Sequence, residues 1–453
     1  MFDATFPKIG RFIAAAAMAV IMIVLTTTIS YAVPSMGRQT GMQCASCHTV
    51  FPELTAFGRQ FKLRGFSMGG IQPDDKSMFG TVPVSFLLQV SRTSTRNIGT
   101  PGATPDDFPR DRQTIVQAAG LYYGGKITDK SGALIQYFYD GIERKWGMEM
   151  FDVRYADSTT FGNNKDLIYG VTLNNSPTLS DIYNSPPVWK FPHADNAGLK
   201  PAASAMIDMM LGSQVGGVGA YTLWNNLVYA EVAAYRTTNS GVFRPLGAGV
   251  VTENVVKNNA APYWRLALQH EWGSNMFSVG TYGMVADIYP DRTDLTTPTN
   301  RFKDIAFDAQ YQYLGGDHVF SAHGTRIRES QDWTANFASG MSTNPTNTLT
   351  TVRLDAHYYY QRRYGGGVQY FSTSGSADPL RYSTGNPVTG SATGSPDTRG
   401  WIAELNYLPI QNVKLALRYT AYNKFNGDST NYDGFGRNAS ANNNIFLLGW
   451  MLF

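Results

Sequence analysis

The chain has 453 residues, of which only 16% are charged, and its formal net charge is +3. Soluble domains carry about 25% charged residues, and the near-neutral balance gives no indication of a nucleic-acid partner, which would call for a basic surface. Aromatic residues reach 13%, with 26 tyrosines and 45 glycines, which favours strands, tight turns and membrane-interface girdles over helices.

Residues 1–32 are predicted to be a secretory signal peptide. Lys8 and Arg11 precede an apolar run from Phe12 to about Thr26, and Ser30-Tyr31-Ala32 follows. A signal peptidase reads small residues at the two positions that Ser30 and Ala32 occupy. A transmembrane anchor is the alternative, because the run approaches the ~20 residues that span a bilayer.

The next unit, residues 33–79, contains Cys44-Ala45-Ser46-Cys47-His48 and with it both cysteines of the chain. In a C-x-x-C-H motif two thiols add to the vinyl groups of one haem, and the adjacent imidazole ligates the iron. A disulfide or half of a zinc site is the alternative, but neither requires this histidine, and zinc would need a second ligand pair. We therefore predict one covalent haem c, attached at Cys44 and Cys47 with His48 as the proximal ligand. Export makes such attachment outside the cytoplasm possible.

Met68 is predicted to be the distal ligand of the haem iron. It lies in a glycine-containing stretch, Gly65 to Gly70, that could fold back over the haem. A methionine ligand raises the reduction potential, which favours accepting an electron. Packing is the ordinary role of any single methionine. The rival candidates for the distal ligand are three methionines of the same unit and two histidines of the region after residue 80: Met36, Met42, Met78, His323 and His357.

A short helix is predicted beside the motif. Pro52 suits a first helical position, and Leu54, Phe57 and Phe61 follow at helix-face spacing before Gly65. Three basic residues fall mainly off this face and either pair with haem propionates or form a solvated surface: Arg59, Lys62 and Arg64. A unit this close to the ~40-residue limit for an independent core needs dense haem packing or a larger neighbour.

Residues 80–453 are predicted to form an antiparallel β-barrel of about 16 strands, which makes the fold mainly β. From Ile305 to Tyr313 apolar and polar residues alternate, as they do from Trp401 to Tyr407 and from Val413 to Ala421. Alternation of this kind places apolar side chains toward lipid and polar ones toward the lumen. A secreted β-sandwich or propeller is the alternative, and it should have a continuous apolar core.

The connections between these segments alternate in length, which is also typical of outer-membrane barrels. Tight turns are predicted near residues 129–132, 225–226, 273–275, 315–317 and 409–412. Long polar loops are predicted near 93–112, 176–210, 237–261, 287–301, 331–346, 374–396 and 423–444. The segment 141–167 is ambiguous. The last residues, Ile445 to Phe453, are predicted to be the final strand, and an even strand number places both barrel ends on the periplasmic side.

The motifs together resemble a known family. Arg38-Gln39-Thr40-Gly41, the C-x-x-C-H motif and Phe51 to Leu63 precede a porin-like region, an order similar to that of the fused monohaem cytochrome-porins, the outer-membrane iron oxidases of iron-oxidising bacteria. The motif likeness covers about residues 38–65. It implies an Fe(II)-oxidising cytochrome-type oxidoreductase that passes the electron to a periplasmic cytochrome or copper protein.

A single haem can serve such a route only from a suitable position. The apolar band of an outer membrane is ~25 Å tall, so a direct relay needs the haem unit as a plug in the lumen, whereas a periplasmic haem needs the donor to diffuse down an open lumen. Three alternatives remain: the same conduit with a donor other than iron, a haem-carrying porin for small solutes, and a soluble secreted haem enzyme. The sequence assigns no iron ligands.

Overall fold

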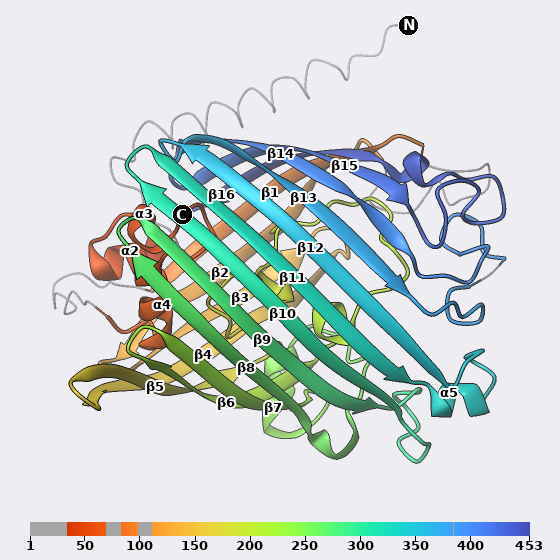
Figure 1. The fold of residues 1–453 in the computed structure, drawn as a ribbon, viewed down its shortest axis with the longest axis horizontal. Helices are drawn as coiled ribbons and strands as arrows, with labels where there is room; N and C mark the ends of the chain where they lie inside the picture. Colours follow the sequence, from red (N-terminus) through yellow and green to blue (C-terminus); the bar gives the residue numbers. More distant parts are fainter. Residues whose placement is uncertain (1–33, 69–82, 98–110, 384) are drawn as a thin grey trace, which may run out of the picture.

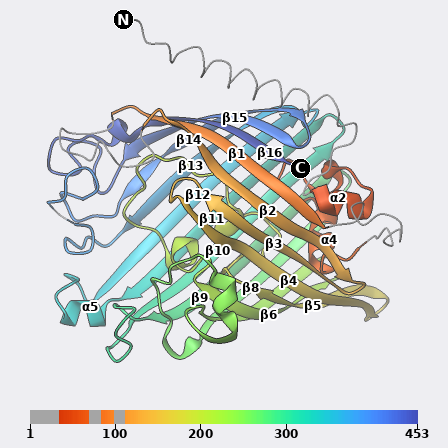
Figure 2. The same ribbon diagram turned by 180° about the vertical axis from the view of Figure 1, so that it is seen from behind.

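The computed structural model describes residues 34–68, 83–97, 111–383 and 385–453 (Figure 1). The predicted signal peptide and the predicted boundary between residues 79 and 80 lie outside the described residues. The described chain forms three N-terminal helices followed by a closed barrel (Figures 1 and 2). None of its described helices has the length and the apolar character needed to span a membrane.

The elements follow one another as a series of helices, then strands with helical turns in the loops. The helices are α2 (Pro34–Thr40), α3 (Cys44–Cys47), α4 (Ala56–Leu63) and α5 (Thr334–Ala338), with short helical turns η1 (Pro187–Trp189), η2 (Met206–Met210), η3 (Gly241–Gly247), η4 (Lys257–Asn259) and η5 (Ala439–Asn442). The first eight strands are β1 (Val84–Thr95), β2 (Thr114–Thr128), β3 (Ser131–Asp140), β4 (Lys145–Phe161), β5 (Lys165–Asn174), β6 (Val215–Trp224), β7 (Val228–Thr237) and β8 (Ala261–Trp272). The second eight are β9 (Asn275–Ile288), β10 (Asn300–Gly315), β11 (His318–Asp332), β12 (Thr346–Tyr360), β13 (Tyr364–Gly375), β14 (Thr398–Ile410), β15 (Val413–Lys424) and β16 (Asn444–Leu452).

The 16 strands pair in sequence order, and β1 pairs with β16 to close the barrel. Every neighbouring pair is antiparallel, for example Gln89 opposite Trp450 at the closing seam. Closure removes the unpaired edges of the sheet. The prediction of an antiparallel barrel of about this size is confirmed, including the terminal strand, and the sandwich or propeller is wrong.

The two faces of the wall differ as the alternation predicted. On β10 the side chain of Phe307 is 62% exposed on the outside, whereas Asp308 is 7% exposed and points into the barrel. On β14 Leu405 faces outward and Glu404 inward, and on β15 Leu417 faces outward and Arg418 inward. An apolar exterior around a polar interior explains the low charge content and the many aromatic residues of the chain.

The connections also match the predicted alternation. One end of the barrel carries the tight turns, and the other end carries long segments such as 175–214, 238–260 and 425–443. The ambiguous segment resolves into a short connection at 141–144, the strand β4, and a turn at 162–164. Since β4 is 17 residues long and its outer face mixes polar with apolar residues, the period-2 pattern alone could not set its limits.

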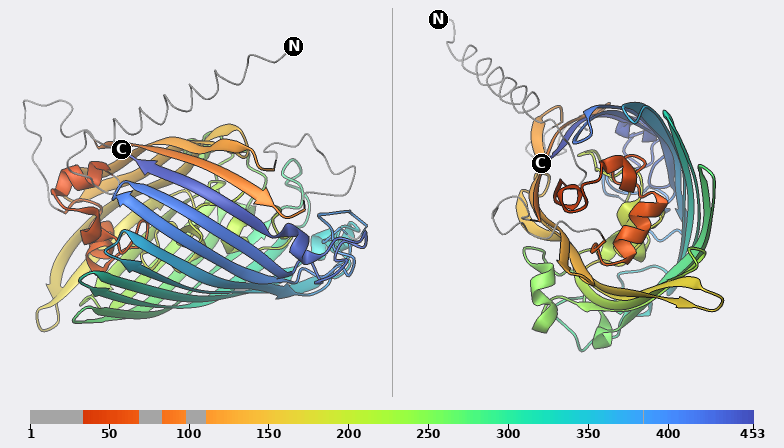
Figure 3. Two further views of the ribbon diagram at one scale, coloured as in Figure 1. Left: turned by 90° about the horizontal axis from the view of Figure 1, so that it is seen from above. Right: turned by 90° about the vertical axis from the view of Figure 1, so that its left-hand side faces the viewer.

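The N-terminal unit, defined as residues 34–68, lies at the tight-turn end and reaches into the barrel (Figure 3). The end-on view in Figure 3 places its helices inside the ring of strands. The chain from 175 to 214, which we call the lumen loop, folds inward against it, and Leu179, Ile182 and Tyr183 of this loop are fully buried. The loop was predicted only as a long polar connection.

Candidate functional site

The motif begins with a single helical turn. Cys44 and Cys47 occupy the first and last positions of α3, and residues three apart on a helix lie on the same face. Cys44 and Cys47 are not joined in a disulfide in this structure, which does not support the disulfide alternative. Burial raises the pKa of the Cys47 thiol to about 11, which keeps this thiol protonated at neutral pH.

His48 leaves the helical turn in an extended conformation, and its ring is fixed by the backbone that follows. Its Nδ1–H donates to the carbonyl oxygens of Pro52 and Glu53, at 3.2 Å each. Nε2 is then the nitrogen that carries the lone pair. Burial lowers the pKa of His48 to about 4, so the imidazole is neutral, as a metal-ligating histidine must be.

The helix after the motif begins later than predicted. Pro52 was expected at the first helical position, but it lies in the turn between α3 and α4, where His48 and Leu54 form a bridge. The helix begins at Ala56 because the Thr55 hydroxyl accepts from the amide of Gly58 at 3.2 Å and caps it. The predicted end is confirmed: α4 stops at Leu63, before Gly65 with φ +68°.

Gly58 brings the two helices of the motif together. A Cβ at this position would lie 2.1 Å from the carbonyl oxygen of Cys47. The same oxygen accepts from the amide of Thr55 at 2.9 Å, and the Thr55 hydroxyl donates to Ser46 at 2.7 Å. Only a glycine allows this close approach of backbone to backbone, so Gly58 sets the position of the cysteine turn against α4.

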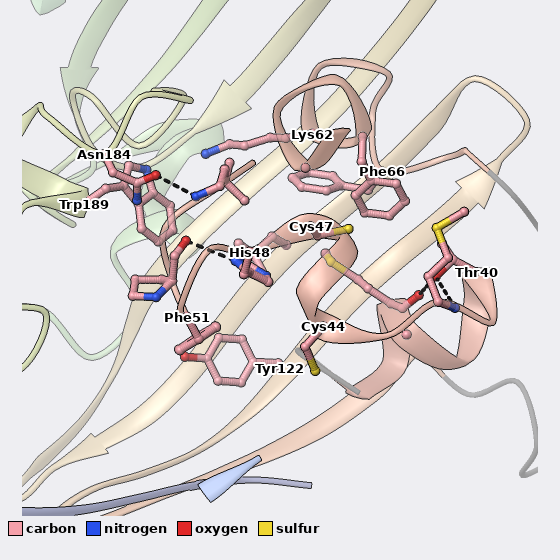
Figure 4. Close-up of a pocket in the computed structure, with 18 of the residues that line it drawn as sticks. Thr40, Cys44, Cys47, His48, Phe51, Lys62, Phe66, Tyr122, Asn184 and Trp189 are labelled. Atoms are coloured by element: carbon pink, nitrogen blue, oxygen red, sulfur yellow. Dashed lines mark hydrogen bonds between the residues drawn. The ribbon is translucent and has the colours of Figure 1, made fainter. Parts of the chain in front are cut away.

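A cavity opens beside the motif (Figure 4). Cys44, Cys47 and His48 line it, with Trp189 and Asn184 of the lumen loop near His48 (Figure 4). Its other walls are largely apolar, and they include Met36, Met42, Phe51, Pro52, Leu54, Phe61, Phe66, Tyr122, Leu134 and Met150. Pockets that bind cofactors are lined mostly by apolar side chains.

These residues suit haem c. The two thiols of one helical turn lie on the cavity with a neutral imidazole. The second ring nitrogen of that imidazole is held by backbone acceptors, which is how proteins orient a metal-ligating histidine. A zinc site does not fit: among the described residues, no group of three or more His, Cys, Asp or Glu side chains close enough to hold a metal includes Cys44 or Cys47.

The structure does not bring Met68 to this cavity. Met68 packs half-buried against the apolar cluster formed by Phe61 and Phe66, and it is absent from the described residues that line the cavity. Met36 and Met42, named as rivals, do line it, and so does Met150 of β4, which the sequence did not single out. Met78 lies outside the described residues.

The two candidate histidines of the barrel lie elsewhere. His323 and His357 do not line the cavity but meet each other and Glu53 on the inner face of β11 and β12. His357 and Asp355 lie together on the inner face of β12, where both side chains are buried.

The three basic residues predicted beside the motif lie in three different environments. Arg64 pairs at the surface with Asp166 at 3.1 Å, which is the solvated alternative. Arg59 is fully buried and donates to the side chain of Gln312. Lys62 lines the cavity, where its Nζ donates to the carbonyls of Leu179 and Asp181 at 2.8 Å each, and burial lowers its pKa to about 7.

A barrel arginine that sequence reasoning missed holds the motif in place. Nη1 of Arg362 donates to the carbonyls of Ala45, His48 and Thr49 at 3.2, 2.7 and 3.2 Å. Arg362 belongs to the tight turn between β12 and β13. A second cavity beside it is lined by Cys44 and His48 as well as by turn residues, so the motif is approached from the tight-turn end too.

The closed sheet, the apolar exterior and the filled polar lumen define a transmembrane β-barrel of the outer-membrane type. No family model matches the chain, and no curated protein matches it in sequence. Among solved structures, the outer-membrane channel DcaP of Acinetobacter baumannii is 11% identical with a TM-score of 0.46, over 82% of this chain and 96% of that chain.

Two further outer-membrane protein structures are similar to the same extent. A loop L8 deletion mutant of OmpT from Vibrio cholerae is 10% identical with a TM-score of 0.44, over 82% of this chain and 98% of that one. An anion-selective porin from Comamonas acidovorans is 12% identical with a TM-score of 0.42, again over 82% and 98%. At these values the likeness carries no functional argument, and function must be argued from this chain's own residues.

Proposed function

We propose that the chain is an outer-membrane electron-transfer protein that binds one haem c at Cys44 and Cys47. The observation that carries the proposal is the cavity beside these thiols, with neutral His48 aligned by two backbone carbonyls. Bound haem supplies one-electron chemistry at its iron. The resemblance to cytochrome-porins in residues 38–65 extends the proposal to Fe(II) as the electron donor.

The chain's own residues would do three things for this chemistry. His48 ligates through Nε2 while Nδ1–H stays on the carbonyls of Pro52 and Glu53, which raises the basicity of the ligand. Apolar walls such as Phe61 and Phe66 exclude water from the cavity. Arg362 and Gly58 fix the motif against the barrel and against α4.

The orientation of the barrel supports a route from outside to the periplasm. Short turns face the periplasm in outer-membrane barrels, and the N-terminal unit lies at that end. The second cavity joins Cys44 and His48 to the turn residues Gln411 and Asn412. A periplasmic cytochrome or copper protein would dock there as the acceptor, and the donor would arrive from the long-loop side.

Anaerobic addition of Fe(II) to the detergent-purified, oxidised protein tests this function. We expect the haem absorbance bands to shift to those of the reduced state, and a Cys44→Ala, Cys47→Ala variant to carry no covalent haem. If the haem accepts electrons from dithionite but not from Fe(II), the donor is not iron. If the purified wild-type protein carries no covalent haem, the whole proposal fails.

A haem-carrying porin for small solutes is the second candidate, because barrels of 16 strands in porins enclose an aqueous channel. Against it stands the lumen, which holds the N-terminal unit and buried residues of the lumen loop such as Leu179 and Tyr183. Single-channel conductance in planar bilayers separates the two. We expect conductance far below that of an open porin of equal strand number, whereas porin-like conductance without Fe(II)-dependent reduction would favour the solute channel.

A further inference from the structure

A second group of metal-ligating side chains lies inside the barrel, apart from the haem cavity. Glu53 comes from the N-terminal unit, while His323 of β11 and Asp355 and His357 of β12 come from the wall. The register explains the meeting of the wall residues: His323 lies directly opposite Asp355, and His357 follows Asp355 two residues later on the same face.

The donor atoms of this group converge. Oδ2 of Asp355 lies 2.8 Å from Nδ1 of His323 and 2.9 Å from Nε2 of His357. Oε1 of Glu53 lies 4.0 Å from Nδ1 of His323. The three ligand atoms offered by Glu53, His323 and His357 all lie within 4.8 Å of one another. All four side chains are at least nine-tenths buried.

We propose that Glu53, His323, Asp355 and His357 form a binding site for a divalent transition-metal cation. Two imidazoles with carboxylates are the donor set of non-haem Fe(II) sites, and a divalent ion balances the two buried carboxylates. Two ligands of one ion lie at most about 4.4 Å apart when each bond is about 2.2 Å. The three ligand atoms of Glu53, His323 and His357 already lie within 4.8 Å of one another, so a small closing movement would bring them to this spacing.

Neighbouring side chains hold the four residues in positions suited to ligating a cation. Oε2 of Glu53 accepts from the hydroxyls of Thr49 and Ser321 at 2.8 Å each, which leaves Oε1 directed to the site. Nε2 of His323 contacts the amide of Gln310 at 2.7 Å, and Oε1 of this buried amide has no partner among the described residues.

A rotation of the Gln310 side-chain amide by about 180° would give its Oε1 a hydrogen-bond donor and would give Nε2–H of His323 an acceptor. Its Oε1 would then accept from Nε2–H of His323, so that Nδ1 of this histidine keeps its lone pair for the cation. Metal-ligating histidines nearly always donate their second ring N–H to such an acceptor. The unpartnered oxygen is thus accounted for by the metal-bound form of the cluster.

Glu53 connects this site to the haem motif. Its carboxylate belongs to the cation site, and its carbonyl oxygen accepts from Nδ1 of His48. Resting on the proposed function, we assign the cation as the electron donor: bound Fe(II) is oxidised to Fe(III), and its single electron reduces the ferric haem iron to ferrous. Binding of a cation, by contrast, stands on the four residues alone.

Zinc chloride is the probe for the site, because Zn²⁺ takes the same N and O ligands and is redox-inert. We expect the detergent-purified, haem-loaded protein to retain one Zn²⁺ per chain after equilibrium dialysis, measured by mass spectrometry of the metal. The zinc X-ray absorption edge, which the haem iron does not contribute to, should show imidazole and oxygen ligands at about 2.0–2.2 Å.

Variants define the residues of the site. His323→Ala and His357→Ala should weaken Zn²⁺ binding at least tenfold, and Gln310→Ala about tenfold through loss of the ligand's support. His270→Ala is the matched control, since His270 is an exposed barrel histidine on β8. If the alanine variants fail to fold, Glu53→Gln keeps the shape of the side chain and removes one charged ligand.

The outcomes for the two proposals are separate. If the wild type retains no Zn²⁺, or if His270→Ala loses it as His323→Ala does, the four residues are a hydrogen-bonded network and the cation site is overturned, whatever Fe(II) does to the haem. If Zn²⁺ binds as expected but Fe(II) never reduces the haem, the site stands and iron oxidation falls. If the cation site and the iron oxidation are both present, bound Zn²⁺ should slow reduction of the haem by Fe(II) but not by dithionite.

Discussion

Replacing Gly58 by alanine should move the cysteine turn away from α4. The new Cβ would lie 2.1 Å from the carbonyl oxygen of Cys47, where real contacts essentially never fall below 3.0 Å, so the two backbones must separate by about 0.9 Å. Overpacking of this kind costs about 1–3 kcal/mol. The gain of about 1 kcal/mol from replacing a helical glycine offsets part of it, and the weakened bond from Thr55 to Cys47 adds about 1 kcal/mol.

The net loss of about 1–3 kcal/mol is local to the motif, because the three atoms nearest the added Cβ all belong to Cys47. Amide hydrogen exchange measures it, and the amide of Thr55 should exchange about tenfold faster for each 1.4 kcal/mol. Covalent haem content should fall with it. Gln60→Ala, at a half-buried position of the same helix, is the control that should change neither. Unchanged exchange and full haem content in Gly58→Ala would refute the close-approach argument.

Three further changes test other parts of the structure. Arg362→Ala removes three hydrogen bonds to residues 45–49. It should lower the free energy of local opening by about 2 kcal/mol and make residues 34–68 more sensitive to limited proteolysis. Arg363→Ala, whose hydrogen bond is exposed, should not, and equal sensitivity in both variants would contradict the role of Arg362 in holding the motif. Burial acts to raise the pKa of Asp378, but hydrogen bonds led by that from Ser342 lower it well below its usual range. The stabilisation by this carboxylate is therefore complete above its unfolded pKa of about 3.9 and is lost only as the pH falls through the lower folded value. Loops 333–345 and 376–397 should resist proteases in the wild type even at about pH 4, and Asp378→Asn should lose this resistance at neutral pH. An unaltered digest of the variant would show that the Asp378 carboxylate does not hold these loops together. Met68→Leu should leave the absorbance spectrum of the oxidised haem unchanged. If the distal ligand is a sulfur, replacing one of the cavity methionines by leucine should alter that spectrum. An altered spectrum in Met68→Leu, with unchanged spectra in the cavity variants, would make Met68 the ligand. The cavity methionines are Met36, Met42 and Met150.

The barrel could be predicted from sequence because its determinants are local. Side-chain alternation along one strand is set by lipid on one face and the lumen on the other, so segments such as Ile305 to Tyr313 reveal their faces without any knowledge of their partners. Loop lengths add independent information, since tight turns and long loops lie at opposite ends, with the short connection 141–144 at the long-loop end as an exception. The helix limits were less secure, because the cap at Thr55 competes with the ordinary preference of Pro52 for a first turn.

The site was only half predictable. Three motif residues within five positions define the haem attachment, but their supports come from far along the chain: Arg362 lies 314 residues from His48. No periodicity indicates that the carboxylate of Glu53 meets His323. The sequence held one signal of the inward fold of the lumen loop: apolar residues are frequent around Leu179, Ile182 and Trp189, in a segment predicted as a long polar loop.

The barrel wall supplies the core that the N-terminal unit lacks. Phe61 and Phe66 are buried in one cluster with residues of β1, β2, β3 and β16, and Leu63 is buried in another with residues of β5 to β8. Burial of three large apolar side chains is worth roughly 5–9 kcal/mol, comparable to the whole stability of a small domain. A unit this close to the ~40-residue limit for an independent core could not gain this alone. Because these anchors lie on two separate sectors of the barrel wall, the position of His48 and Glu53 relative to the wall histidines is fixed by the strands themselves.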